Sequence, residues 1–206
     1  MGKVLDALDE KLTGVVLRQP LFFVATAPAG RDGHVNVSPK GTSGTFAVLD
    51  PRTVAYLDLT GSGVETIAHL RDNGRITLMF CTFEGPPLIV RLHGRGEVVV
   101  PTDDRFPDLL AAFPEQADAP GIRSVVRVDV ERVSTSCGYS VPLMEYQGDR
   151  PQLRQWAERR GPDGVEAYRG EKNAESIDGL PGLPGLPRDP GPGVGVGELP
   201  AAAPRR

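Results

Sequence analysis

The chain of 206 residues is poor in cysteine and has no long apolar run. Its two cysteines, Cys81 and Cys137, cannot build a disulfide framework, so we expect both to stay reduced in a cytoplasm. No apolar stretch approaches the length of a membrane span. The first residues, MGKVLDALDEKL, are amphipathic and acidic and lack the layout of an export signal. These absences predict a cytoplasmic protein with no membrane partner.

Clustered positive charge and metal-ligand spacings are also missing. The formal net charge is −4, and the basic residues are spread along the chain, so no nucleic-acid partner is predicted. His34, His69 and His93 have no nearby Cys, Asp or Glu at metal-ligand spacing, so no metal site is predicted. The sequence contains no G-x-S-x-G motif or Ser/His/Asp layout, which gives a hydrolase little support.

What the sequence does contain is alternating apolar residues, which predict a mainly β protein with flanking helices. Runs rich in β-branched and aromatic residues, separated by turn signals, predict strands, and apolar residues at helical spacing predict helices. This order favours a six-stranded antiparallel barrel with helices packed outside. The expected strands are 20–27, 34–39, 53–59, 75–83, 88–100 and 123–135, and the expected helices are 3–12, 63–73, 102–113 and two within 150–173, broken at Gly161-Pro162.

The same pattern divides the chain into four regions. We expect an N-terminal helix in residues 1–14, the β-barrel domain in 15–135 and a helical extension in 136–178. From Gly179 the sequence is dominated by Gly and Pro and has no periodic apolar face. Residues 179–206 are therefore expected to form a disordered tail.

The stretch HVNVSPKG, residues 34–41, raises the first functional question. His34, Asn36 and Ser38 alternate with valines, as in a half-buried strand, and a proline then ends the pattern. Lys40, which follows this proline, is either a solvated turn residue or a cation directed at an anion. These residues alone favour neither interpretation.

The stretch LTGSGVET, residues 59–66, raises the second question, because a strand ends there and a helix begins at once. Ser62 and Glu65 have the spacing of a capping box, so the loop can exist simply to start the helix. Alternatively, Gly61 and Gly63 allow a phosphate to approach backbone N–H groups at the helix start, beside the hydroxyls of Thr60, Ser62 and Thr66. The carboxylate of Glu65 argues against a phosphate here.

Several stretches together resemble the pyridoxamine 5′-phosphate oxidase-like family of split β-barrels, which bind flavin mononucleotide (FMN). They are HVNVSPKG, LTGSG, HLRDNGRITLMF and LHGRGEVV, and the resemblance covers roughly residues 15–135. Two further stretches, CGYSVPLMEY and EKNAESIDGLPGLP, are similar to a subgroup described as predicted flavin-nucleotide-binding proteins. The resemblance implies an FMN-binding split β-barrel that forms a homodimer with the cofactor between its subunits.

The resemblance also implies a cofactor site. In the family, the segment that matches 34–40 runs beside the flavin, and the loop that matches 60–66 holds its phosphate. The FMN ligands expected by this correspondence are Asn36, Ser38, Lys40, Thr60, Gly61, Ser62 and Thr66. This chain departs from the oxidases at Glu65 and Thr66, where they carry an Arg-Lys pair, and at about Ile89, where they carry a flavin-contacting glutamine. Oxidation of pyridoxamine phosphate itself is therefore not supported.

The sequence leaves more than one function open. The first is an FMN-dependent oxidoreductase that acts on a small-molecule redox substrate. The second is a protein that binds or stores flavin or deazaflavin (F420) without turnover. The third is a haem-binding barrel, with His34, His69 or His93 as the axial ligand. The family fold accommodates all of these cofactors, so it does not choose among them.

Overall fold

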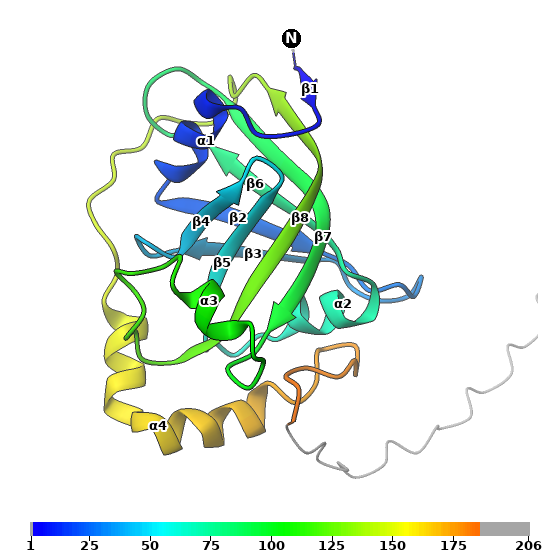
Figure 1. Ribbon diagram of the computed structural model, residues 1–206, viewed down its shortest axis with the longest axis vertical. Helices are drawn as coiled ribbons and strands as arrows, with labels where there is room; N and C mark the ends of the chain where they lie inside the picture. The colour runs from blue at the N-terminus through cyan, green and yellow to red at the C-terminus, as the bar shows by residue number, and fades with distance from the viewer. Residues whose placement is uncertain (1, 186–206) are drawn as a thin grey trace, which may run out of the picture.

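A computed structural model describes residues 2–185 of the chain, which fold around one curled antiparallel sheet with flanking helices (Figure 1). The strands follow the order β3-β2-β6-β7-β8-β5-β4, and the short β1 pairs with β8 outside this order. Every pairing is antiparallel. The predicted fold, a mainly β split barrel with flanking helices, is confirmed, although the sheet has eight strands where six were expected.

The element bounds show which predictions were accurate. The expected strands correspond to β2, β3, β5, β6, β7 and β8, whereas β1 and β4 were missed. The elements in chain order are β1 (Val4–Leu5), α1 (Glu10–Leu17), β2 (Leu21–Thr26), β3 (Asn36–Gly41), β4 (Phe46–Asp50), β5 (Thr53–Leu59), α2 (Glu65–Asn73), β6 (Arg75–Cys81), β7 (Ile89–Val99), α3 (Phe106–Leu110), β8 (Ile122–Ser136) and α4 (Gln152–Lys172).

The N-terminal helix lies later in the chain than expected. The predicted helix 3–12 is wrong, because Val4 and Leu5 pair with β8 as a short strand. Helix α1 begins after Asp9, whose side chain accepts a hydrogen bond from the Leu12 N–H at 2.7 Å and so caps the helix. The helical spacing of the apolar residues was real, but the cap places the helix start at residue 10.

The hydrophobic core lies inside the curl of the sheet. Phe22, Phe46 and Phe80 come from three strands, with ring centroids 5.0–5.3 Å apart. Tyr56 joins them edge-on to Phe22, and Val16 of α1 is buried in the same cluster. Burying a large apolar side chain contributes about 1.5–3 kcal/mol, so this cluster supplies much of the stability that holds the sheet curled.

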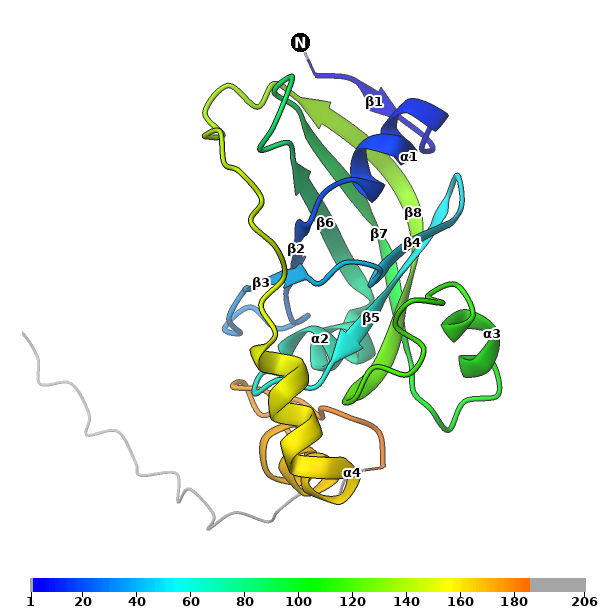
Figure 2. The same ribbon diagram turned by 90° about the vertical axis from the view of Figure 1, so that its left-hand side faces the viewer.

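The C-terminal part of the chain wraps back beneath the barrel (Figure 2). Helix α4 changes direction at Gly161, whose φ of 66° and ψ of 173° are not helical, and Pro162 follows; the predicted break is confirmed. Residues 173–185 then return to α2, where Leu183 packs against Val64 and Ile67. Residues 179–185, which the sequence placed in the tail, thus contact the domain, and residues 186–206 lie outside the described part. No helix of residues 2–185 is long and apolar enough to cross a membrane.

Candidate functional site

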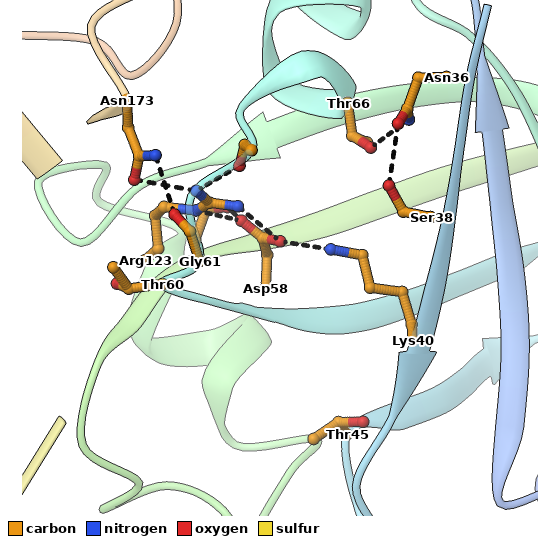
Figure 3. A network of polar contacts seen from close by, with 12 residues as sticks. Asn36, Ser38, Lys40, Thr45, Asp58, Thr60, Gly61, Thr66, Arg123 and Asn173 are labelled. Carbon is orange, nitrogen blue, oxygen red and sulfur yellow. Dashed lines mark hydrogen bonds and ion pairs between the residues drawn. The ribbon is translucent and has the colours of Figure 1, made fainter. Parts of the chain in front are cut away.

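Strand β3, the end of β5 and the start of α2 bring most of the expected site residues into one region (Figure 3). Along β3, Asn36, Ser38 and Lys40 are partly buried, whereas the residues between them are exposed. The two-residue period of the strand therefore turns these three side chains toward the sheet end where α2 begins. Thr66, in the first turn of α2, faces Asn36.

Asn36 is the centre of a chain of polar contacts between β3 and α2. Its amide donates to Thr66 Oγ1 at 3.0 Å and to Thr26 Oγ1 at 3.1 Å, and its carbonyl oxygen accepts from Ser38 at 3.0 Å. Thr26 Oγ1 also lies 3.0 Å from Nδ1 of the buried His69. These contacts fix the orientation of Asn36, Ser38 and Thr66 relative to the helix start.

Lys40 is not a freely solvated turn residue. Its Nζ lies 3.0 Å from Oδ1 of Asp58 and 5.8 Å from the ring centroid of Tyr56. Arg123 approaches the same carboxylate, with Nε 2.7 Å from Asp58 Oδ2. Burial alone would raise the pKa of Asp58, but the charges of Lys40 and Arg123 outweigh it and hold the pKa well below the usual 3.8.

The ion cluster of Lys40, Asp58 and Arg123 carries an excess of positive charge. Two cations face one carboxylate, so its formal charge is +1. Asp58 and Arg123 are almost fully buried, with side-chain exposures of 1% and 4%, whereas Lys40 stays partly open. A buried or half-buried cation without a full complement of negative charge attracts an anion.

In the loop between β5 and α2, the carbonyl groups of residues 61–63 accept hydrogen bonds from protein side chains, whereas their N–H groups have no acceptor among the described residues. Arg123 donates to the Gly63 carbonyl at 2.9 Å, and Asn173 donates to the carbonyls of Gly61 at 3.0 Å and Ser62 at 3.4 Å. Within residues 2–185, the N–H groups of Gly61, Ser62 and Gly63 donate no hydrogen bond. Consecutive open N–H groups before a helix are the usual arrangement for binding an anion.

The predicted capping box of α2 is wrong. The N-cap residue is Val64, and no side chain caps the helix. Val64 is buried against Ile67 and Leu183, and this apolar packing sets the helix start. Glu65 folds back over the loop instead, with Oε2 2.7 Å from where a Cβ on Gly63 would stand. A carboxylate therefore lies beside the open N–H groups.

Thr60 differs from the other expected ligands because its hydroxyl is already used. Its Oγ1 donates to the Gly121 carbonyl at 2.8 Å and accepts from Arg169 Nε at 3.0 Å. The side chain of Thr60 thus secures the loop to the rest of the protein. Of the predicted residues, Asn36, Ser38, Lys40 and Thr66 lie together, and Gly61 and Ser62 supply open backbone donors.

Sequence reasoning missed the side chains that hold the site together: Asp58, Arg123, Arg169 and Asn173. Two of them carried a signal. Asp58 interrupts an apolar strand, YLDL, and Arg123 starts another, RSVVRV, so both charges were placed where a partner is needed. The β5–β8 register puts Asp58 opposite Ser124, next to Arg123. The contacts of Arg169 and Asn173 join residues more than a hundred positions apart and left no local pattern.

The histidines and cysteines lie apart from this region or inside the core. His34 pairs with Asp178, with Nδ1 2.7 Å from Oδ1, and His93 contacts Thr77 at 3.1 Å. Among the residues that the structure describes, no group of three or more His, Cys, Asp or Glu side chains could hold a metal ion. Both cysteines are free thiols; Cys81 is buried and Cys137 is exposed.

An open antiparallel barrel with flanking helices places the chain in the split-barrel class. A family model described as pyridoxamine 5′-phosphate oxidase matches residues 8–137, and the chain belongs to this family. A relative from Aspergillus flavus, described as pyridoxamine 5′-phosphate oxidase family protein ustO, is 43% identical over 202 residues, which cover 90% of this chain and 80% of the relative.

Solved structures of two other proteins are similar in fold. A FAD-binding protein from Mesorhizobium loti matches with a TM-score of 0.47 and 18% identity, covering 66% of this chain and 96% of that one. The heme storage protein HutZ from Vibrio cholerae matches with a TM-score of 0.44 and 14% identity, covering 64% of this chain and 97% of that one.

Proposed function

We propose that this protein binds FMN at the β3–α2 region and acts as an FMN-dependent oxidoreductase on a small-molecule substrate in the cytoplasm. One observation carries the proposal: the loop 61–63 has its carbonyls bound by protein side chains and its N–H groups open. Such a loop fits the phosphate of FMN. Family membership supports the same assignment.

The charges near the loop also fit a phosphate. The cluster of Lys40, Asp58 and Arg123 has a formal charge of +1, and Lys40 is the member that remains partly open. Its ammonium group has three donors, of which Asp58 engages one, so the others are available to a phosphate oxygen. Glu65 opposes this attraction from the first turn of α2. We therefore expect a phosphate that is held by backbone donors and one lysine.

The remaining expected ligands would hold the rest of the cofactor. Asn36, Ser38 and Thr66 form a connected polar row along β3 and α2, and their orientation is fixed by their mutual hydrogen bonds. When FMN is bound, its isoalloxazine ring supplies the hydride chemistry. The protein would position that ring and exclude water from one side, and no acid or base of the chain is assigned to the reaction.

We further propose that the functional form is a homodimer. Strand β3 is at an edge of the sheet, and Val37 on this strand and Val35 just before it are 61% and 72% exposed. The same outer face carries an open hollow of about 390 Å³ lined by Ala25, Val35, Ile76 and His93, among others. An exposed apolar edge next to a hollow is a typical surface for a second copy. Sedimentation that shows a monomer with cofactor bound at micromolar concentration would contradict the dimer.

The absorption spectrum of the purified protein tests the cofactor. Flavin bands support the proposal, whereas a deazaflavin band or a haem band would replace it with one of the two alternatives. Apo-protein is then titrated with FMN and with riboflavin, which lacks the phosphate, and we expect FMN to bind more tightly. Bleaching of bound FMN by NADPH would favour an enzyme, and flavin that no electron donor reduces would favour a storage protein.

A further inference from the structure

The segment that ends α4 and follows it makes several polar contacts with the loop of the candidate site. This segment comprises residues 169–183 and includes the stretch EKNAESIDGL. It lies beneath α2 and the end of β5, on the lower side of the barrel in both views (Figures 1 and 2). Two of its residues, Arg169 and Asn173, reach the loop directly.

Asn173 is fully buried and uses both ends of its amide. Its Nδ2 donates to the carbonyls of Gly61 and Ser62, and its Oδ1 accepts from Arg123 at 2.9 Å. Because Arg123 itself donates to the Gly63 carbonyl, these two side chains bind the three successive carbonyls of the loop. Figure 3 shows Asn173 contacting both Gly61 and Arg123, and Arg123 in turn contacting Asp58, which Lys40 reaches from the other side.

Arg169 secures the residue just before the loop. Its Nε donates to Thr60 Oγ1 at 3.0 Å, and its terminal nitrogen donates to the Ile122 carbonyl at 2.8 Å. The Thr60 N–H also donates to the Gly121 carbonyl at 2.9 Å. The chain is thus fixed at Thr60 by Arg169, at Gly61 and Ser62 by Asn173, and at Gly63 by Arg123, which Asn173 contacts.

We propose that Arg169 and Asn173 are positioning residues for the cofactor phosphate. They bind the loop through its carbonyls and through Thr60, so the N–H groups of Gly61, Ser62 and Gly63 are held in place before an anion arrives. A glycine-rich loop loses more conformational freedom on binding than other segments, and ordering it beforehand makes binding tighter. This inference rests on the proposed function, because it requires a phosphate at this loop.

Asn173→Ala tests the inference without changing any charge. Apo-protein of the wild type and the variant is titrated with FMN and with riboflavin. We expect FMN to bind about tenfold more weakly to the variant, the loss of about one hydrogen bond's free energy. Riboflavin affinity should change much less, so the preference for FMN over riboflavin falls. An equal loss for both ligands, or no loss, would overturn the positioning role.

Arg169→Lys provides a second variant in case Asn173→Ala does not fold. It keeps the positive charge but cannot reach Thr60 and Ile122 with the geometry of a guanidinium group. We expect the FMN preference to fall here as well. The matched control is Arg154→Lys on the same helix, because Arg154 pairs only with Glu158 among the described residues and does not touch the loop. A control that lowers the preference equally would overturn the inference.

Hydrogen exchange of the apo-protein gives a readout that does not depend on the cofactor. Asn173→Ala and Arg169→Lys should speed amide exchange at Thr60, whose N–H donates to the Gly121 carbonyl, whereas Arg154→Lys should not. Unchanged exchange in both site variants overturns the positioning role alone. A wild-type protein that binds FMN no better than riboflavin overturns the phosphate site itself, and this inference with it.

Discussion

Lys40 Nζ and Asp58 Oδ1 lie 3.0 Å apart, so a lysine on the edge strand β3 is joined to a buried carboxylate on β5. The two residues are on strands that do not pair with each other, β3 and β5. Their contact therefore spans the open side of the split barrel. It gives Lys40 both a structural role and, in the proposed function, a part in binding phosphate.

Lys40→Met should affect stability and cofactor affinity together. The variant removes a charged hydrogen bond worth about 1.5–3 kcal/mol, while Arg123 still pairs with Asp58. We expect the free energy of unfolding of the apo-protein, measured by urea denaturation, to fall by this amount. FMN affinity should fall about ten- to a hundredfold by the same reasoning. Lys11→Met, at an exposed position of α1, is the control and should stay within about 0.5 kcal/mol. Unchanged FMN affinity would limit Lys40 to the structural role.

Glu65→Gln should tighten FMN binding. The carboxylate of Glu65 lies against the loop and repels a phosphate at the helix start. A charge at this position is worth about 0.3–1 kcal/mol, so FMN should bind roughly two- to fivefold more tightly, with riboflavin unchanged. Glu10→Gln is the matched control, because Glu10 occupies the first turn of α1. If Glu65→Gln leaves the preference for FMN over riboflavin unchanged, the phosphate does not lie at residues 61–66.

Leu183→Ala should destabilise the protein although Leu183 follows the last helix. Its side chain is only 8% exposed and packs against Val64 and Ile67. Truncating a buried leucine costs about 2–5 kcal/mol, and we expect the lower end here because the site lies near the surface. Leu17→Ala, at a position 51% exposed, should cost much less. Equal melting temperatures for the two variants would show that the segment does not dock in solution.

His69→Gln should reduce the loss of stability at acid pH. Burial lowers the pKa of His69 below the ordinary 6.5, so the folded protein keeps the ring neutral. Below pH 6.5 the unfolded chain binds a proton that the folded protein does not, so the stability present above this pH is lost as pH falls toward the folded pKa. Unfolding free energies between pH 7.5 and 5 should therefore decline less steeply in the variant.

His93 provides the comparison for this pH dependence. Burial lowers the pKa of His93 too, and the charges of Arg132 and Arg91 add to the effect. His93→Gln should consequently make the free energy of unfolding decline less steeply over the same pH range. In the double variant the decline should be smaller still. A His69→Gln profile parallel to that of the wild type would contradict the assignment of a neutral, buried His69.

The sequence predicted the long elements and one face of the site well, because both depend on local periodicity. Alternation along residues 34–38 placed Asn36 and Ser38 on one side of a strand, and β3 has this arrangement. The pattern was expected to end at Pro39, but β3 continues to Gly41, so Lys40 lies on the same side as Asn36 and Ser38. Strand β4 was missed because FAVLD is short and merges into the turn at Asp50-Pro51. The capping box at Ser62 failed because burial of Val64, a tertiary effect, decided where the helix begins.

The partners of the site residues could not be predicted because they are distant in sequence. Asp58 meets Arg123 across 65 positions, and Asn173 meets Gly61 across 112. No local pattern encodes such pairs. Only the unusual presence of a charge inside an apolar strand indicated that Asp58 and Arg123 need partners.

The contact between Asn173 and Gly61 also sets an order of events during synthesis. Ribosomes release the chain from its N-terminus, and the strands that form the barrel, through β8, precede residue 137. A nascent chain that has released only these strands lacks Arg169, Asn173 and Leu183, so the loop at 61–63 has none of its C-terminal contacts. The barrel can therefore fold while translation continues, but the loop acquires its final partners only after the last part of the domain has left the ribosome.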